Sequence, residues 1–361
     1  MKRCIYFGTL FCCSLFASCA QTHQSDYAVI DLVNHKQLAT EQIALSDISE
    51  SIQLIPLETN DSVLVGRISG IKLEGDKLYI HASNGLFVFN KNGKFLNTIG
   101  SKGRGPKEYL YLSEVFPKND IVWLVDDTGK RVLKYADSGT FLEGFDFIKK
   151  HRFMNYYHSE GDTFIAFLPD LGQTNTDIML AFFNATGLID SVLYRNPAPE
   201  GSTMVMMYNE ITFINYGSQI KCKYMFNDTI YQIRNNQLYP DMVLSLGAGK
   251  ANEKARIEAV VGGLEFDPYK GMDVIRLWGE SDRYLYFKVY INMEKNLLFW
   301  DKKEQKAHKW SFILPNDKRL DPDQLEKFIP IDIDKNGNLV GEAAPANADD
   351  NQVIVVAKLK R

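Results

Sequence analysis

The chain has 361 residues and a formal net charge of −4, with 41 lysine and arginine residues against 45 aspartate and glutamate residues. No basic tract with interleaved aromatic residues is present, so nucleic acid is excluded as an expected partner. Aromatic residues make up 12% of the sequence, which suits broad stacked sheets.

Residues 1–18 have the features of a secretory signal. Lys2 and Arg3 precede a short apolar run, which is too short for a stable membrane anchor. The run ends in Leu15-Phe16-Ala17-Ser18-Cys19, which resembles the lipobox of bacterial lipoproteins and predicts lipidation of Cys19. An ordinary signal peptide that is cleaved nearby is the alternative. Residues 19–39 are then expected to form a polar tether, with at most a short strand around residues 27–32.

Beyond Cys19, Cys222 is the remaining cysteine, so the exported chain cannot form an internal disulfide. The apolar residues near Cys222 predict that its thiol is buried in a strand and inert. Packing alone must therefore hold the fold together.

An aromatic residue that precedes a tight turn recurs along the chain. Phe89, Tyr135, Phe183 and Tyr231 are separated by 46, 48 and 48 residues. A turn residue follows each of them after four positions: Gly93, Gly139, Gly187 and Asn235. Strands joined by such turns at this period predict the blades of a β-propeller.

A fifth aromatic residue, Trp300, follows Tyr231 after 69 residues, about twenty more than the period. Helix-forming residues at 252–262 predict that a short helix accounts for the excess. A second helical insert is expected at residues 322–328, where Asp321 can cap the helix and Pro322 can occupy its first turn.

The last segment predicts three strands, at residues 329–333, 338–342 and 352–359. A blade needs four strands, and residues 52–57 at the other end of the chain can supply the missing outer one. The expected fold is thus all-β: a six-bladed propeller over residues 40–361, closed by pairing of its two terminal strands.

Three ordered motifs carry a family resemblance: Ile55-Pro56-Leu57-Glu58-Thr59, Ile99-Gly100-Ser101-Lys102-Gly103-Arg104-Gly105-Pro106-Lys107-Glu108-Tyr109, and Phe226-Asn227-Asp228-Thr229-Ile230-Tyr231. With them the chain resembles the six-bladed propeller lipoproteins of Bacteroides-type bacteria, although Lys107 stands where relatives usually carry glycine. The resemblance implies a lipoprotein of the cell envelope with a six-bladed fold and no particular activity. We expect a monomeric propeller on the outer membrane. Because residues 20–24 lack the acidic residues that some surface-exported relatives carry just after the lipidated cysteine, the periplasmic side is favoured. It extends distantly to NHL-repeat propellers, which mostly bind partners, and to gluconolactonase-type propellers, which use a metal.

The glycine-rich connector at residues 99–109 is the candidate ligand site. Arg104, Lys107, Glu108 and Tyr109 would lie near the central channel and could bind a polar ligand. The alternative, which we favour, is that Arg104 and Glu108 brace neighbouring blades while the glycines shape the turn.

Other polar clusters have structural explanations. Residues 332–337 copy the start of a calcium loop but lack its last acidic ligand, which favours a hairpin turn. Asp126 and Asp127 could be channel carboxylates, but capping of free backbone amides in a turn is favoured. His151 and His158, near Tyr156 and Tyr157, could line a pocket but are expected to lie in a loop. No metal site or cofactor is predicted.

Two functions remain open, besides a purely structural role in the cell envelope that would apply if neither face of the propeller offered a pocket. The first is a lipoprotein, anchored to the membrane by its lipid, that binds a glycan, a peptide or a partner protein as a scaffold. The second is a hydrolase, lyase or lactonase acting on a carbohydrate-type substrate in the channel. The sequence contains no catalytic motif, which favours binding.

Overall fold

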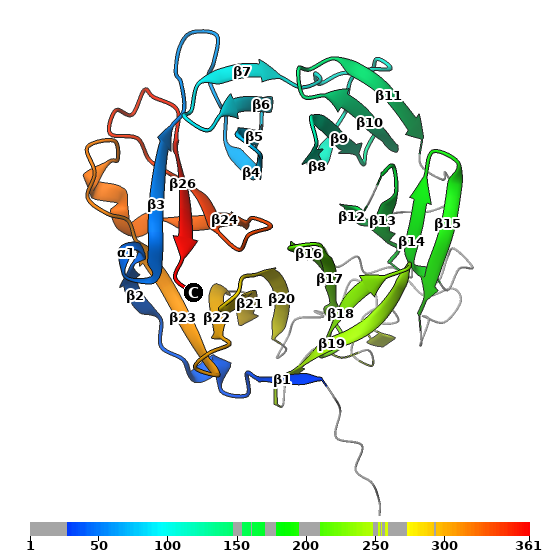
Figure 1. The fold of residues 1–361 in the computed structure, drawn as a ribbon, viewed down its shortest axis with the longest axis vertical. Helices are drawn as coiled ribbons and strands as arrows, with labels where there is room; N and C mark the ends of the chain where they lie inside the picture. The colour runs from blue at the N-terminus through cyan, green and yellow to red at the C-terminus, as the bar shows by residue number, and fades with distance from the viewer. Residues whose placement is uncertain are drawn as a thin grey trace, which may run out of the picture.

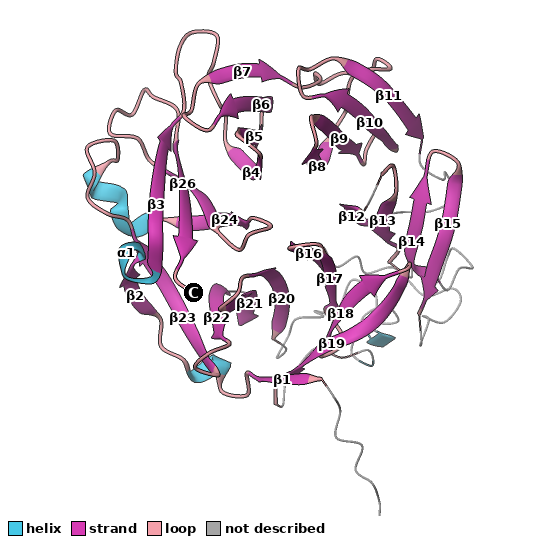
Figure 2. Ribbon diagram, in the orientation of Figure 1, coloured by secondary structure: helices cyan, strands magenta, loops and turns pink. Residues whose placement is uncertain are grey.

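The computed structural model describes residues 27–146, 154–159, 161–169, 178–194, 210–247, 252, 254, 257–258, 273–291 and 294–361. These residues form six sheets arranged in a ring, with very few helices (Figures 1 and 2). The fold is a six-bladed β-propeller, as the repeat in the sequence predicted.

The first three blades are consecutive four-stranded antiparallel sheets. The strands of the first blade are β4 (Ile68–Glu74), β5 (Lys77–Ala82), β6 (Gly85–Asn90) and β7 (Phe95–Thr98). The strands of the second are β8 (Leu112–Lys118), β9 (Ile121–Asp126), β10 (Arg131–Ala136) and β11 (Phe141–Asp146). The strands of the third are β12 (Met154–His158), β13 (Phe164–Phe167), β14 (Ile178–Asn184) and β15 (Gly187–Leu193).

The other three blades each recruit a strand from the amino-terminal segment. The fourth contains β16 (Ile211–Tyr216), β17 (Gln219–Tyr224), β18 (Thr229–Arg234), β19 (Gln237–Ser245) and β1 (Ala28–Asp31). The fifth contains β20 (Val274–Glu280), β21 (Tyr284–Ile291), β22 (Glu294–Asp301), β23 (Lys306–Ile313) and β2 (Glu41–Ala44). The sixth contains β24 (Ile329–Ile333), β25 (Leu339–Ala343), β26 (Val353–Leu359) and β3 (Ser49–Pro56).

The first strand of each blade lies nearest the axis. Figure 1 shows β4, β8, β12, β16, β20 and β24 around the centre of the ring, and each of these inner strands contacts the inner strands of both neighbouring blades. The connector from an outer strand to the next inner strand must therefore run inward to the channel.

The hydrophobic core is divided among the interfaces between blades rather than gathered at one centre. Strand periodicity explains the division, because alternate side chains point to opposite faces of a sheet. In β21, Leu285 and Phe287 pack toward the fourth blade, whereas Tyr284 and Tyr286 pack toward the sixth. Both faces of a blade are buried in this way.

The repeating aromatic residues all lie on the third strand of their blades: Phe89, Tyr135, Phe183, Tyr231 and Trp300. The turn residues four positions after the first four of them have positive φ angles, for example 82° at Gly93 and 48° at Asn235. A Cβ at Gly93 would lie 1.9 Å from the carbonyl oxygen of Pro56, so this position requires glycine for space as well.

The two ends of the chain share one sheet. β26 pairs antiparallel with β3, with Ile354 opposite Ile55, and Figure 1 shows the two strands side by side. Asn351 reinforces the closure: its side-chain amide donates to the carbonyl oxygens of Glu58 and Val63, at 2.8 Å each. The predicted closure is confirmed.

The amino-terminal segment contributes more to the fold than predicted. β1, within the segment assigned to the tether, pairs parallel with β19, and β2 pairs parallel with β23. The 3-10 helix η1 (His35–Gln37) lies between β1 and β2, and helix α1 (Leu45–Ile48) follows β2. His35 is buried and its Nε2 lies 3.0 Å from Asp273 Oδ2. The propeller therefore begins before residue 40.

The helical insert predicted at residues 322–328 is the 3-10 helix η3 (Pro322–Lys327), capped by Asp321, which accepts a bond from the Asp323 amide. Most of the insert at 252–262, like the signal segment, Cys19 and His151, lies outside the described residues. Within the described part of the chain, no helix is long and apolar enough to cross a membrane.

Candidate ligand site at the channel mouth

A cavity of about 710 Å³ opens at one end of the central channel. Its walls are the first residues of β4, β8 and β24, the turn between β5 and β6, and parts of β21, β22 and β25. We call this cavity the basic mouth, because its lining contains four cationic side chains and one carboxylate: Arg67, Lys102, Lys288, Lys295 and Glu342.

The cations of the basic mouth are available to a ligand. Arg67, Lys102 and Lys295 are exposed, and in the described part of the chain none of the four cations forms an ion pair. The one carboxylate is half-buried. Burial raises the pKa of Glu342, and the Arg67 charge offsets part of that rise. The mouth is therefore positively charged.

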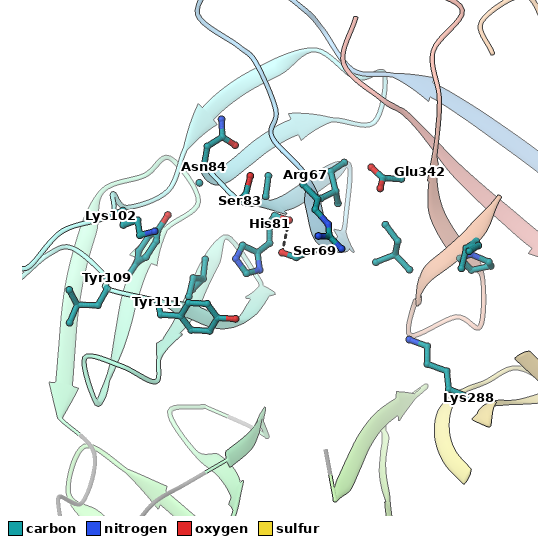
Figure 3. Close-up of a pocket in the computed structure, with 18 of the residues that line it drawn as sticks. Arg67, Ser69, His81, Ser83, Asn84, Lys102, Tyr109, Tyr111, Lys288 and Glu342 are labelled. Atoms are coloured by element: carbon teal, nitrogen blue, oxygen red, sulfur yellow. Dashed lines mark hydrogen bonds between the residues drawn. The ribbon is translucent and has the colours of Figure 1, made fainter. Parts of the chain in front are cut away.

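Lys288 is the most buried of these cations. Its Nζ lies 4.1 Å from the centre of the Trp278 ring, and Figure 3 shows its side chain directed into the cavity. Burial, aided by the nearby Lys295, lowers the pKa of Lys288 to about 7. Its amine therefore gains charge near neutral pH, and an anionic ligand would favour that charged form.

Neutral polar groups and an exposed ring complete the mouth. Tyr111 is 62% exposed and projects into the cavity from the side opposite Lys288 (Figure 3). Ser83 and Asn84 are exposed on the adjacent turn. Burial lowers the pKa of His81, so its half-buried imidazole is neutral at pH 7. The mouth thus offers a stacking surface, hydrogen-bonding groups and cations together.

Farther along the channel, Lys72 of β4 and Asp332 of β24 form an ion pair with an Nζ to Oδ2 distance of 2.6 Å. Burial alone would lower the pKa of Lys72, but the Asp332 carboxylate and Glu114 hold it above its ordinary value. This pair bridges the first and sixth blades inside the channel.

A family model described as a domain of unknown function, DUF4934, matches residues 27–358. The chain belongs to the DUF4934 family. The match covers all six blades and the amino-terminal strands that join them. Among curated proteins, none matches this DUF4934 chain.

Solved structures resemble this chain to different degrees. A Bacteroides fragilis NCTC 9343 protein that is inferred to be exported is similar to the DUF4934 chain with a TM-score of 0.65 and 18% identity, over 92% of this chain and 100% of its own. A DUF4221 member from Bacteroides vulgatus ATCC 8482 has a TM-score of 0.46 and 12% identity, over 87% and 98%. A virginiamycin B lyase from Staphylococcus aureus has a TM-score of 0.46 and 12% identity, over 85% and 99%.

In the DUF4934 chain the four residues of the predicted ligand site separate. Tyr109 is buried and lines the basic mouth, whereas the other three lie outside its lining. Arg104 is exposed and, among the described residues, makes no hydrogen bond or ion pair. Lys107 is exposed, with its Nζ 5.8 Å from the Phe141 ring.

The side chain of Glu108 stabilises its own connector, and its backbone carbonyl joins that connector to the second blade. Its carboxylate accepts a hydrogen bond of 2.8 Å from the Gly105 amide, and its backbone carbonyl accepts one from the Arg131 guanidinium. Arg104 makes no hydrogen bond or ion pair with a described residue. The predicted bracing of neighbouring blades by the side chains of Arg104 and Glu108 is therefore not found. The connector belongs to the wall of the mouth chiefly through Lys102 and Tyr109.

The structural interpretation is confirmed for Asp126 and for residues 332–337, whereas the Asp127 carboxylate accepts a bond of 2.7 Å from the Tyr156 hydroxyl instead of capping backbone amides. Asp126 is fully buried, and its carboxylate accepts bonds from the amides of Leu110, Tyr111 and Gly129 at 2.8–3.0 Å. Residues 332–337 form a hairpin turn, in which Asp334 accepts from the Asn336 amide at 2.8 Å. The Cys222 thiol is buried, as predicted, and burial raises its pKa.

A potential ligand set for a metal lies at the outside of the fifth blade: Asp301, Glu304 and His308. Asp301 is already engaged there. Its Oδ2 accepts a bond of 2.7 Å from Arg283 Nε and its Oδ1 a bond of 2.8 Å from the Lys303 amide. Asp301 therefore has a structural role in the C-terminal end of β22.

The expectation that Tyr156, Tyr157 and His158 lie in a loop is wrong. They form part of β12, an inner strand, and all three line a channel cavity. Sequence reasoning also missed Lys72, Glu114 and Asp332. A usable signal was present: each is a charged residue inside a short, otherwise mostly apolar strand.

Proposed function

We propose that this chain is an exported propeller that binds an acidic oligosaccharide at the basic mouth. The observation that carries the proposal is the set of four cations, without ion-pair partners among the described residues, around one cavity with a single carboxylate. Carboxylate or sulfate groups on a sugar would satisfy these cations by charge-assisted hydrogen bonds. The exposed ring of Tyr111 and the hydroxyl group of Ser83 suit a sugar ring and its hydroxyl groups.

The test is the binding of tetragalacturonate, measured by isothermal titration calorimetry beside the neutral maltotetraose. We expect the double variant Arg67→Ala/Lys102→Ala to weaken tetragalacturonate binding at least tenfold. A hydrogen bond to a charged group contributes about 1.5–3 kcal/mol, and about 1.4 kcal/mol corresponds to a factor of ten. Both side chains are exposed, so the melting temperature should not change.

Arg104→Ala is the matched control, because Arg104 is an exposed arginine on the same connector but outside the lining of the cavity. It should leave both affinity and melting temperature unchanged. Loss of binding in Arg104→Ala, with full binding in the double variant, would move the site to the connector loop that the sequence predicted. If tetraglutamate bound with the same affinity as tetragalacturonate, the ligand class would be an acidic peptide and not a glycan.

The proposal includes attachment to the outer membrane through Cys19, on the periplasmic side. Its support is the lipobox-like sequence that ends at Cys19 and the inferred export of the Bacteroides fragilis relative. Two or three acyl chains contribute about 0.8 kcal/mol for each buried methylene, which is enough for a durable anchor.

We expect Cys19→Ala to move the protein from the membrane fraction to the soluble fraction of the cell envelope. Immunoblots of fractionated cells measure the change, and Cys222→Ala serves as the control because that thiol lies inside the propeller. Retention of the Cys19→Ala protein in the membrane fraction would contradict lipidation at this residue.

A further inference from the structure

A second cavity, of about 780 Å³, opens at the other end of the channel. The basic mouth is lined by the first residues of β4, β8 and β24, and this cavity by the last residues of the same strands. Residues of β12, β16 and β20 also line this second cavity, so all six blades contribute to it. We call it the aromatic mouth.

Three rings from consecutive blades line the aromatic mouth. The ring centres of Phe116 and Tyr157 are 6.0 Å apart, and those of Tyr157 and Phe213 are 5.8 Å apart. Each ring is half-buried, so part of its surface faces the cavity. A row of this kind provides stacking surface for a flat or ring-bearing ligand.

Glu114 is the carboxylate that the aromatic mouth leaves without a partner. Three other acidic residues line the cavity and all are engaged: Glu74 with Lys335 at 2.6 Å, Asp332 with Lys72 at 2.6 Å, and Asp334 with backbone amides. Glu114 is half-buried and forms no hydrogen bond or ion pair with any described residue. It stands two positions before Phe116 on β8, so the carboxyl group and the ring share one face of the strand.

We propose that the aromatic mouth binds an organic cation, namely an ammonium group carried on a ring, with the ammonium at Glu114 and the ring on Phe116 and Tyr157. Two of the three lysines that line the cavity, Lys72 and Lys335, are paired with other carboxylates. Glu114 therefore feels the charge of Lys72 but has no ion pair of its own among the described residues. Lys118 is exposed at the end of β8, toward solvent. An ammonium also gains from the faces of the aromatic rings.

The protonation of Glu114 gives this site a pH signature. Burial raises its pKa to about 7, against the opposing effect of Lys72 and with the support of Asp332. Other titratable groups that line the cavity include Tyr156 and Tyr157, whose pKa values burial raises, and His158, whose pKa burial lowers. The paired Glu74, Asp334 and Lys335 lie there as well. Because an ammonium needs the ionised carboxylate, affinity should rise as the pH increases from 6 to 8.

The test uses tryptamine as the probe and 3-indolepropionate, with the same ring and the opposite charge, as its counterpart. Calorimetry should show millimolar or tighter binding of tryptamine and an increase of several-fold in affinity between pH 6 and pH 8. Glu114→Gln should weaken binding at least tenfold and remove that pH dependence, and Tyr157→Ala should weaken it as well.

Glu74→Gln is the control in the same cavity, because Glu74 is already paired with Lys335. The Glu74→Gln variant should bind tryptamine with the same affinity as the wild type. Glu114→Gln should keep or raise the melting temperature, since ionised Glu114 is a desolvated charge without a partner, so lost binding will not reflect unfolding. Absence of tryptamine binding at several millimolar, unchanged binding by Glu114→Gln, or equal binding of 3-indolepropionate would overturn the proposal. The Arg67→Ala/Lys102→Ala variant should bind tryptamine normally, which separates the two mouths.

Discussion

Truncation after Gly341 is expected to unfold the whole propeller in one cooperative step. The missing residues include β26, which lies between β25 and β3, so its loss leaves both strands with unpaired edges. Ile354, Val355 and Leu359 of β26 are buried, and burial of three such side chains contributes about 5–9 kcal/mol. The total stability of a domain is typically about 5–15 kcal/mol. Differential scanning calorimetry should therefore show no transition at the temperature of the full-length chain.

A chain that ends at Leu359 is the control, because it lacks only the exposed Lys360 and Arg361. It should melt within a few degrees of the full-length protein. Addition of a synthetic peptide of residues 342–361 to the truncated chain should restore a transition. A truncated chain that keeps the full-length melting temperature would show that the shared sheet does not hold the ring closed.

Glu280→Gln is expected to destabilise the protein by about 3–5 kcal/mol, the usual cost of removing one partner from a buried ion pair. Glu280 is 3% exposed and its two carboxylate oxygens lie 2.7 Å from Lys221 Nζ and 2.6 Å from Lys302 Nζ. Lys221 comes from the fourth blade and also pairs with Asp241, at 2.8 Å, so the substitution leaves its buried ammonium with one carboxylate in place of two at the junction of two blades. Chemical denaturation with urea measures the change in the free energy of unfolding.

Glu74→Gln is the matched control, since it makes the same substitution in the more exposed pair with Lys335 and should cost less than about 1 kcal/mol. Burial alone would lower the pKa of Lys221, but Asp241 and Glu280 hold it above its ordinary value. The stabilisation from this pairing is thus complete below the ordinary lysine pKa and is lost only as the pH rises above the raised one. If both variants lost the same free energy of unfolding near pH 7, the buried cluster would contribute no more stability than the exposed pair.

The blades could be predicted because a blade is a local structure. Four strands that follow one another in the chain leave an aromatic residue and a turn residue at nearly constant spacing, as Phe89 with Gly93 and Tyr135 with Gly139 do. The closing sheet followed from counting strands, since three strands at one end needed the strand at residues 49–56. The sequence allowed at most a short strand around residues 27–32, where β1 lies. Neither its pairing with β19 nor the strand β2 was predicted, because a short parallel edge strand has no turn or repeat to mark it.

The sequence by itself determined the number of blades, the closure of the ring and the buried state of Cys222, because each depends on strand period and on turns between neighbours in the chain. Only the tertiary structure decided which side chains face the channel. Arg67, Lys102, Lys288 and Lys295 meet at one mouth, and Phe116, Tyr157 and Phe213 at the other, although each set is drawn from several blades. The ring brings one inner strand from each blade to the axis, so residues far apart in the chain become neighbours there. No spacing pattern in the sequence predicts these contacts.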